Sequence, residues 1–286
     1  MKRIAFWGDA GWAVGRIGRA VQKYSGHVVD IWDWSDPSQN NKLFSHAWYE
    51  YDVIIVPTCL TDYDPHVTLS PDVYRRLLVV AHCPIVNHPF FRETVCVRPG
   101  ASYAGVSVEA CREMERHGMG PACWLPFGAD LDDFPIRHVV SDQIKRVGLI
   151  ANPDGQRDYA DVKGLDEFRL ICDRLGIKPI YIYGNTPGSY IYNDIDLLVC
   201  CSRFEAGPLG IFEAGASGVP VLTRPVGNAQ RIKGIKTFDT VDDAVRQIRL
   251  WNNHPRSLKD YATDVTNEIR ENWSMEKLIK SNKLFS

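Results

Sequence analysis

Two glutamates, Glu205 and Glu213, stand eight positions apart in a stretch of otherwise mostly small and apolar residues. Residues 203–221 read RFEAGPLGIFEAGASGVPV. An ionised carboxylate among apolar residues is costly to bury unless another group bonds to it. The pattern therefore leaves two interpretations: a ligand bonds to both glutamates, or Glu213 lies on a solvated stripe of a helix while Glu205 caps a turn.

The spacing predicts a helix that carries Glu213 and begins close to Glu205. Gly207 is an acceptable N-cap, Pro208 suits a first helical turn, and Gly218 would end the helix. A helix N-terminus offers free amides and a partial positive charge, which together favour a phosphate. We therefore expect a phosphorylated ligand at the helix start, with its hydroxyls on Glu213 and another polar part on Glu205.

The string from Ser202 to Val221 as a whole resembles the E-x7-E signature of retaining glycosyltransferases with the GT-B fold, specifically the GT4-like family. The resemblance covers about residue 103 to the end of the chain, with weaker fits before. It implies that Glu205 contacts the transferred sugar and Glu213 the ribose hydroxyls of the nucleotide. It also places one loop near the sugar and the phosphates, namely Gly207, Pro208, Leu209 and Gly210.

A second segment, VGLIANPDGQRDYADVKG, resembles the first strand of the family's donor domain and the Lys-Gly pair that follows a loop. Lys163 matches the family's lysine, whose ammonium offsets the charge of the diphosphate. The family usually has a basic residue directly after the Val-Gly of this strand, whereas this chain has Leu149. Arg157 is a candidate replacement, and a solvated loop arginine is the other interpretation of that residue.

Two positions in the first half match the family more loosely. A glycine-rich turn at residues 8–15 lacks the G-x-G-x-x-G pattern of dinucleotide-binding proteins, and in the family such a turn approaches the donor phosphates. Gly11 is thus either a donor contact or an ordinary turn residue. His82 matches a family histidine that contacts the transferred sugar, while a structural role and the nearby His88 stay as alternatives.

Short apolar runs alternate with helical patterns along the chain, which predicts an α/β protein with parallel sheets and crossover helices. The expected strands lie within residues 3–8, 26–34, 51–58, 76–88, 103–108, 122–130, 145–153, 178–185, 194–202, 219–227 and 235–239. The polar stretch 132–145 is interpreted as a linker. The expected parts are an acceptor-side Rossmann-like domain (1–135), a donor domain (136–265) and a terminal helix that crosses back to the first domain (266–286).

This organisation agrees with the GT-B fold, in which two Rossmann-like, doubly wound domains face each other across a cleft. The resemblance implies metal-independent transfer of a sugar from a nucleoside diphosphate sugar, UDP- or GDP-sugar foremost, to an acceptor hydroxyl, without a cofactor. A nucleotide-sugar epimerase of the same fold and a catalytically degenerate sugar-nucleotide-binding subunit are the alternatives. The acceptor is expected to be a glycan, a lipid-linked molecule or a small molecule, with a modified DNA base also open.

The composition sets broad bounds on class and location. A net charge of −2 gives no global sign of a nucleic-acid or membrane-surface partner. The eight cysteines contain no C-x-x-C pair, which favours reduced thiols over zinc ligation or disulfides. The N-terminus does not read as a signal peptide, and no apolar run approaches the roughly 20 residues of a membrane span. A cytoplasmic location is the resulting expectation.

Overall fold

The computed structural model describes residues 1–8, 13–33, 36–57, 70–82, 100–154, 157–183 and 189–285. The chain divides into two compact units. The first unit consists of Met1–Phe127 together with Met275–Ser286, and the second unit consists of Gly128–Ser274. Among the described residues, no helix has both the length and the apolar character needed to cross a membrane.

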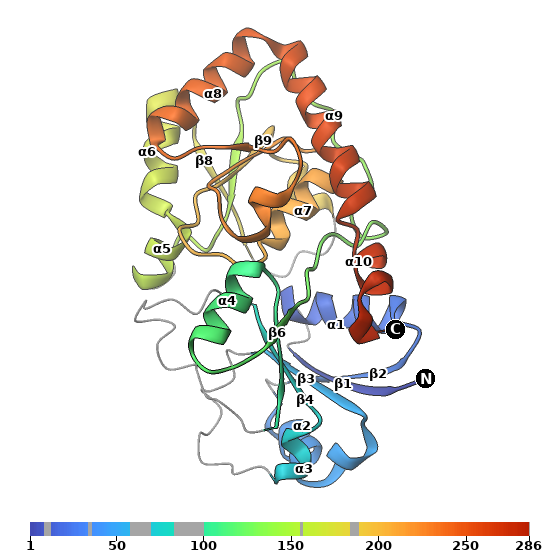
Figure 1. The fold of residues 1–286 in the computed structure, drawn as a ribbon. Coiled ribbons are helices and arrows are strands. Elements are labelled where there is room, and N and C mark those ends of the chain that lie inside the picture. The colour runs from blue at the N-terminus through green and yellow to red at the C-terminus, as the bar shows by residue number, and fades with distance from the viewer. Residues whose placement is uncertain are drawn as a thin grey trace. The chain divides into compact units, whose positions relative to one another are not determined.

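Six parallel strands form the sheet of the first unit, in the order β2-β1-β3-β4-β5-β6 (Figure 1). They are β1 (Arg3–Gly8), β2 (Val28–Asp33), β3 (Val53–Pro57), β4 (Leu77–Ala81), β5 (Ser102–Gly105) and β6 (Ala122–Trp124). The accompanying α-helices are α1 (Ala13–Tyr24), α2 (Pro37–Lys42), α3 (Pro71–Tyr74), α4 (Val108–Arg116) and α10 (Met275–Ser281). The π-helix η1 (Leu43–Ala47) and the 3-10 helices η2 (Trp48–Glu50) and η7 (Lys283–Phe285) add short turns of helix. The central strands are apolar on both faces and buried, as expected of parallel strands covered by helices.

The end of the chain belongs to the first unit. Helix α10 packs against α1 (Figure 1), and the side-chain amide of Asn282 donates to the carbonyl oxygen of Trp124 at 3.3 Å. Segments from opposite ends of the sequence therefore complete one core. The sequence had placed the start of this returning segment at residue 266, whereas the second unit continues to Ser274.

The second unit holds five parallel strands in the order β11-β10-β9-β7-β8. They are β7 (Val147–Ile150), β8 (Pro179–Ile182), β9 (Leu197–Cys200), β10 (Val221–Thr223) and β11 (Lys236–Thr237). The helices are α5 (Arg157–Lys163), α6 (Leu165–Leu175), α7 (Leu209–Ala216), α8 (Val241–Asn253) and α9 (Pro255–Asn272), with shorter turns η5 (Ser189–Tyr192) and η6 (Gly227–Arg231).

The strand order of the second unit reverses at β7. The chain runs from β7 to β8 on one side, and β9, β10 and β11 then extend the sheet from the other side of β7. Right-handed crossovers in opposite directions put helices on opposite faces, and accordingly α6 packs with α8 while α7 packs with α9 (Figure 1). Ligands of doubly wound sheets bind outside the carboxyl ends of the strands at such a reversal. The ends of β7 and β9 are therefore the place to look for a site.

The stretch 132–145, interpreted from the sequence as a linker, is part of the second unit. The backbone amides of Arg137 and His138 both donate to the carbonyl oxygen of Ser217, at 3.2 and 3.1 Å. The amide of Ile144 donates to the side chain of Asn252 at 2.7 Å. The polar composition of this stretch reflects an irregular segment whose backbone is bonded to helices, and not a free connection.

Candidate functional site

Lys163 and Glu205 form an ion pair at the carboxyl edge of the second unit's sheet. The Nζ atom of Lys163 contacts Oε1 of Glu205, and the Ser202 hydroxyl donates to the same oxygen at 3.3 Å. The two side chains are only 21% and 15% exposed, so each charge depends on the other for much of its stabilisation. A bound anion or a sugar hydroxyl could take the place of one partner beside the charge that remains.

Local structure explains how the two residues meet. Lys163 is the last residue of α5, the helix that follows β7, and Glu205 lies in the loop between β9 and α7. Because β7 and β9 are neighbours in the sheet, their carboxyl ends bring these segments together across 42 positions of sequence. The sequence predicted both residues as functional but did not predict that they pair.

The start of α7 lies four residues after Glu205 and has no side-chain cap from its N-cap residue. The helix begins at Leu209, and its N-cap is Pro208, not Gly207 as predicted. The first turn has no acidic residue, and Pro208 makes no side-chain cap hydrogen bond. Amides and the dipole at a helix N-terminus favour an anion. The predicted end is confirmed, since Ser217 is the C-cap and Gly218 follows with a φ of +93°.

Glu213 is buried in α7 and does not lie on a solvated stripe. It is 2% exposed, and the hydroxyl of Tyr192 donates to its Oε2 at 3.0 Å. Tyr192 comes from η5, is itself 1% exposed, and packs its ring against Phe134. The bond from Tyr192 uses one of the roughly four acceptor positions of a carboxylate. No local sequence pattern indicated Tyr192, because its partner lies 21 positions away.

The loop that carries Glu205 is supported from behind by a second turn. Gly227 has a φ of +46°, and a Cβ at this position would overlap the backbone carbonyl oxygens of Glu205 and Ala206. The amide of Asn228 donates to the carbonyl oxygen of Ala206 at 3.0 Å. Glycine at 227 is thus required by both the backbone angle and the close approach. The turn holds the backbone of the Glu205 loop in place.

Other residues singled out by the sequence lie in different parts of the second unit or outside the described residues. Leu149 is 1% exposed in β7, so this position contributes to the core and offers no charge. Gly210 lies in the first turn of α7 against the side chain of Ile150. Arg157 is the first residue of α5, but its side chain lies outside the described part of the chain, as do Gly11 and His88.

His82 follows β4 in the first unit. Its ring stacks on Phe127 with 6.1 Å between centroids and 10° between planes. Burial lowers the pKa of His82 to about 4, so the imidazole is neutral at physiological pH. Its buried Nε2 atom has no hydrogen-bond partner among the described residues. A neutral imidazole can give or receive one hydrogen bond at each nitrogen, but it supplies no positive charge.

The cysteine close to the ion pair, Cys200, is not activated for nucleophilic chemistry. Cys200 ends β9 and is buried; desolvation, and next the negative charge of Glu205, raise the pKa of its thiol. The residue is therefore a thiol at neutral pH and not a nucleophilic thiolate. Within the described ranges, no group of three His, Cys, Asp or Glu side chains is placed to hold a metal ion.

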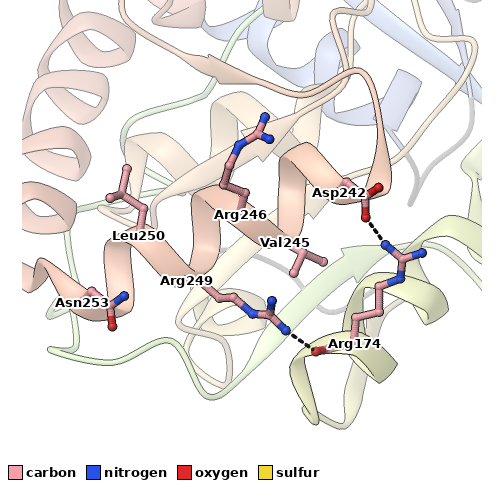
Figure 2. A pocket seen from close by; sticks show the side chains of 7 residues that line it. All are labelled: Arg174, Asp242, Val245, Arg246, Arg249, Leu250 and Asn253. Atoms are coloured by element: carbon pink, nitrogen blue, oxygen red, sulfur yellow. Dashed lines mark hydrogen bonds and ion pairs between the residues drawn. The ribbon is translucent and has the colours of Figure 1, made fainter.

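A surface pocket on the second unit lies away from these residues, between α6 and α8 (Figure 2). It is lined by Arg174, Asp242, Val245, Arg246, Arg249, Leu250 and Asn253. Arg174 pairs with Asp242, Arg246 pairs with Asp243, and Arg249 donates to the carbonyl oxygen of Arg174 at 3.0 Å. The pocket lies on two helix faces, whereas ligands of doubly wound sheets bind outside the carboxyl ends of the strands, so the ends of β7 and β9 form the better candidate site.

Solved structures with a similar fold include a complex with UDP-glucose, a sucrose-phosphate synthase and a glycosyltransferase. HepE of Anabaena, solved in complex with UDP-glucose, is 13% identical, and the match covers 98% of this chain and 97% of HepE with a TM-score of 0.64. Sucrose-phosphate synthase of Thermosynechococcus elongatus gives 13% identity, 98% and 96% coverage and a TM-score of 0.63. AviGT4, a glycosyltransferase involved in avilamycin A biosynthesis, is 14% identical, and the match covers 98% of this chain and 95% of AviGT4 with a TM-score of 0.61.

The chain has the GT-B fold. Two parallel α/β units, the second doubly wound about β7, are the elements of this fold. The sequence itself matches no protein-family model and no curated protein. At 13–14% identity, the likeness establishes the GT-B fold and does not by itself establish the reaction.

Proposed function

We propose that this chain is a retaining glycosyltransferase of the GT4-like family that moves a sugar from a nucleoside diphosphate sugar to an acceptor hydroxyl without a metal ion. The observation that carries the proposal is the contact between Lys163 and Glu205 just before the N-terminus of α7. The site thus offers a cation, helix amides and a carboxylate within one corner of a GT-B fold. The cation and the amides suit a diphosphate, and the carboxylate suits a sugar hydroxyl.

The proposed reaction places each group at a developing charge. The bond between the anomeric carbon and the β-phosphate oxygen breaks, and its electron pair leaves with the diphosphate. Lys163 and the amides at the start of α7 stabilise the negative charge that builds there. The acceptor oxygen forms the new bond on the same face of the sugar, and its proton passes to the departing phosphate. Glu205 orients the sugar and is not a covalent nucleophile.

Glu213 is proposed to hold the nucleoside. Ribose hydroxyls that donate to this buried carboxylate would leave water. In such a buried place, a hydrogen bond to a charged acceptor is strong. Tyr192 would keep the carboxylate oriented while the ribose binds. UDP-glucose is the first donor to test because HepE was solved with it, and GDP-sugars are the second. A glycan, a lipid-linked molecule or a small molecule is the proposed acceptor.

A thermal-shift screen tests donor binding directly. UDP-, GDP-, ADP- and dTDP-sugars are added to wild-type protein, to Glu213→Ala and to Glu276→Ala, whose glutamate pairs with Lys280 on an exposed helix face. A donor at about 100 times its Kd stabilises the folded chain by about 2.7 kcal/mol, which raises the Tm by several degrees. The shift should persist in Glu276→Ala and be lost in Glu213→Ala. The absence of a shift with every nucleotide would refute the donor site.

Turnover assays separate transfer from the alternatives. With a binding donor, the wild type should transfer sugar to members of an acceptor panel and hydrolyse donor slowly, with the anomeric configuration kept. Lys163→Met and Glu205→Gln should each reduce the rate by about 100-fold or more. A changed sugar configuration without any acceptor would indicate an epimerase. Binding with neither transfer nor hydrolysis would indicate a degenerate binding subunit.

A further inference from the structure

Arg203 joins the two segments that carry the ion pair. It lies two residues before Glu205, and its guanidinium reaches the corner between α5 and α6. There it donates to the carbonyl oxygen of Asp161 at 3.2 Å and contacts the carboxylate of the same residue. It also donates to both carboxylate oxygens of Asp166, at 3.1 and 3.0 Å, and to Oε1 of Glu167 at 3.1 Å. These three acidic residues flank Lys163 on both sides.

The backbones of the same two segments are also in contact. The amide of Arg203 donates to the carbonyl oxygen of Val162 at 2.8 Å. Gly164 has a φ of +64°, and a Cβ there would overlap the carbonyl oxygen and side chain of Cys201. The residues on either side of Lys163 are thus bonded to, or packed against, residues just before Glu205.

A third segment joins the network of Arg203, Asp161, Asp166 and Glu167, which we name the Arg203 frame. Glu167 accepts from Nε and Nη2 of Arg224, which follows β10, at 2.9 and 2.6 Å. The side chains of Glu167, Arg203 and Arg224 are 16%, 28% and 22% exposed, so this is not an isolated surface ion pair of small net effect. Burial lowers the pKa of Arg203, but hydrogen bonds with Asp166 and Glu167 outweigh that effect and raise it overall.

We propose that Arg203 is a positioning residue that holds the ammonium of Lys163 against the carboxylate of Glu205. Its planar guanidinium, with five N–H donors in a fixed geometry, spans three carboxylates at once. The distance between the cation for the diphosphate and the carboxylate for the sugar is then set by the Arg203 frame. The consequence for turnover rests on the proposed function, whereas the geometric claim does not.

The geometric claim is tested by a double-mutant cycle between Lys163→Met and Glu205→Gln, with Tm as the readout. In the wild-type background the two changes should be non-additive by about 2 °C, because the residues are in contact. The cycle is repeated with Arg203→Met and with Arg174→Met. Arg174 is a matched control, since it lies on α6 and pairs with Asp242 without reaching the site.

The coupling should disappear in the Arg203→Met background and persist with Arg174→Met. If coupling survives without Arg203, the positioning proposal is wrong. Should Arg203→Met fail to fold, Asp161→Asn removes one of the three links at a side chain that is 52% exposed, and the coupling should then be weakened. Undiminished coupling in Asp161→Asn would also overturn the proposal.

Turnover tests the consequence for catalysis. Arg203→Met should lower kcat by about tenfold or more while the Kd of UDP-glucose, measured by calorimetry, stays within about threefold. Arg174→Met should change neither quantity. An unchanged kcat in Arg203→Met would show that the frame has only a structural role. If the wild type does not turn over any donor, the proposed function fails, and the coupling experiment still decides the geometry.

Discussion

Glu205 and Glu213 are the same residue type in one short segment, yet their surroundings differ. Glu205 meets a cation, and Glu213 meets the hydroxyl of a buried tyrosine. A carboxylate beside an ammonium can exchange that partner for a charged ligand, whereas one that already accepts from a hydroxyl suits further hydroxyl donors. The pairing thus supports different proposed duties, a sugar on Glu205 and a ribose on Glu213.

The pH behaviour of His82 is a prediction at the residue scale. The imidazole should titrate near pH 4 in the folded chain, since burial lowers its pKa from the usual value of about 6.5. The unfolded chain then binds a proton at a higher pH than the folded chain does. His82 therefore lowers the free energy of unfolding as the pH falls from about 6.5 towards 4, and has no such effect above 6.5.

The measurement is an NMR titration of histidine ring protons, with His82→Gln to assign the signal. Urea unfolding at several pH values provides the second readout, and the variant should show a flatter dependence between pH 4 and about 6.5. A signal for His82 that titrates at about 6.5 would contradict the prediction and leave the imidazole able to carry charge near neutrality.

The sequence predicted some of these residues and missed others for a physical reason. Lys163, Glu205 and Glu213 belong to short local patterns of charge, glycine and apolar residues, which can be recognised without knowing the fold. Tyr192 and Arg203 matter through partners 21 and up to 42 positions away. Such contacts depend on strand order and on how far each helix extends, and no local pattern specifies either.

At the scale of elements, the strands were easier to predict than the connections. Apolar runs bounded by glycine and polar residues identified β1 and β7, because a parallel strand is buried on both faces and has few polar residues. The family resemblance predicts a loop before Lys163, whereas the structure has helix α5, whose sequence RDYADVK shows little apolar periodicity. It is seven residues long and ends at the Gly164 turn, so its local composition gave a weak signal.

The two ends of α6 give a matched prediction. Gly164 and Gly176 flank the helix with nearly equal φ values of +64° and +66°. An added Cβ at 164 would overlap Cys201, whereas no described residue lies within 4 Å of one at 176. Gly176→Ala should therefore lose only about 1–2 kcal/mol of unfolding free energy from the left-handed backbone. Gly164→Ala should lose clearly more, because the α5–α6 corner must move away.

Chemical denaturation of the two variants measures this difference. Glycine-to-alanine replacement also restricts the unfolded chain, but by a similar amount at both positions, so the comparison between them isolates the steric effect. Gly164→Ala should in addition reduce the coupling between Lys163 and Glu205, while Gly176→Ala should leave it intact. Equal losses of stability would mean that the corner relaxes without cost and that its position is not fixed by close packing.

At the scale of the whole molecule, the sequence predicted the GT-B fold from alternating strands and helices together with a family resemblance, and the structural neighbours agree. Strand order was not predictable in the same way, because it arises from long-range pairing. The reversal at β7 is the consequence that matters, since it brings the ends of β7 and β9 together. Everything proposed for the donor depends on this one feature of topology.

Hydrogen exchange of the full chain tests that dependence. With saturating UDP-glucose, amide exchange should slow by about tenfold or more in residues 161–167 and 202–213, because a ligand that binds only the folded form suppresses local opening. Residues 242–253, which line part of the α6–α8 pocket, should exchange at an unchanged rate. In Glu213→Ala the protection should vanish at equal ligand concentration. Protection confined to residues 242–253 would instead place the ligand in the surface pocket and refute a donor site at the strand reversal.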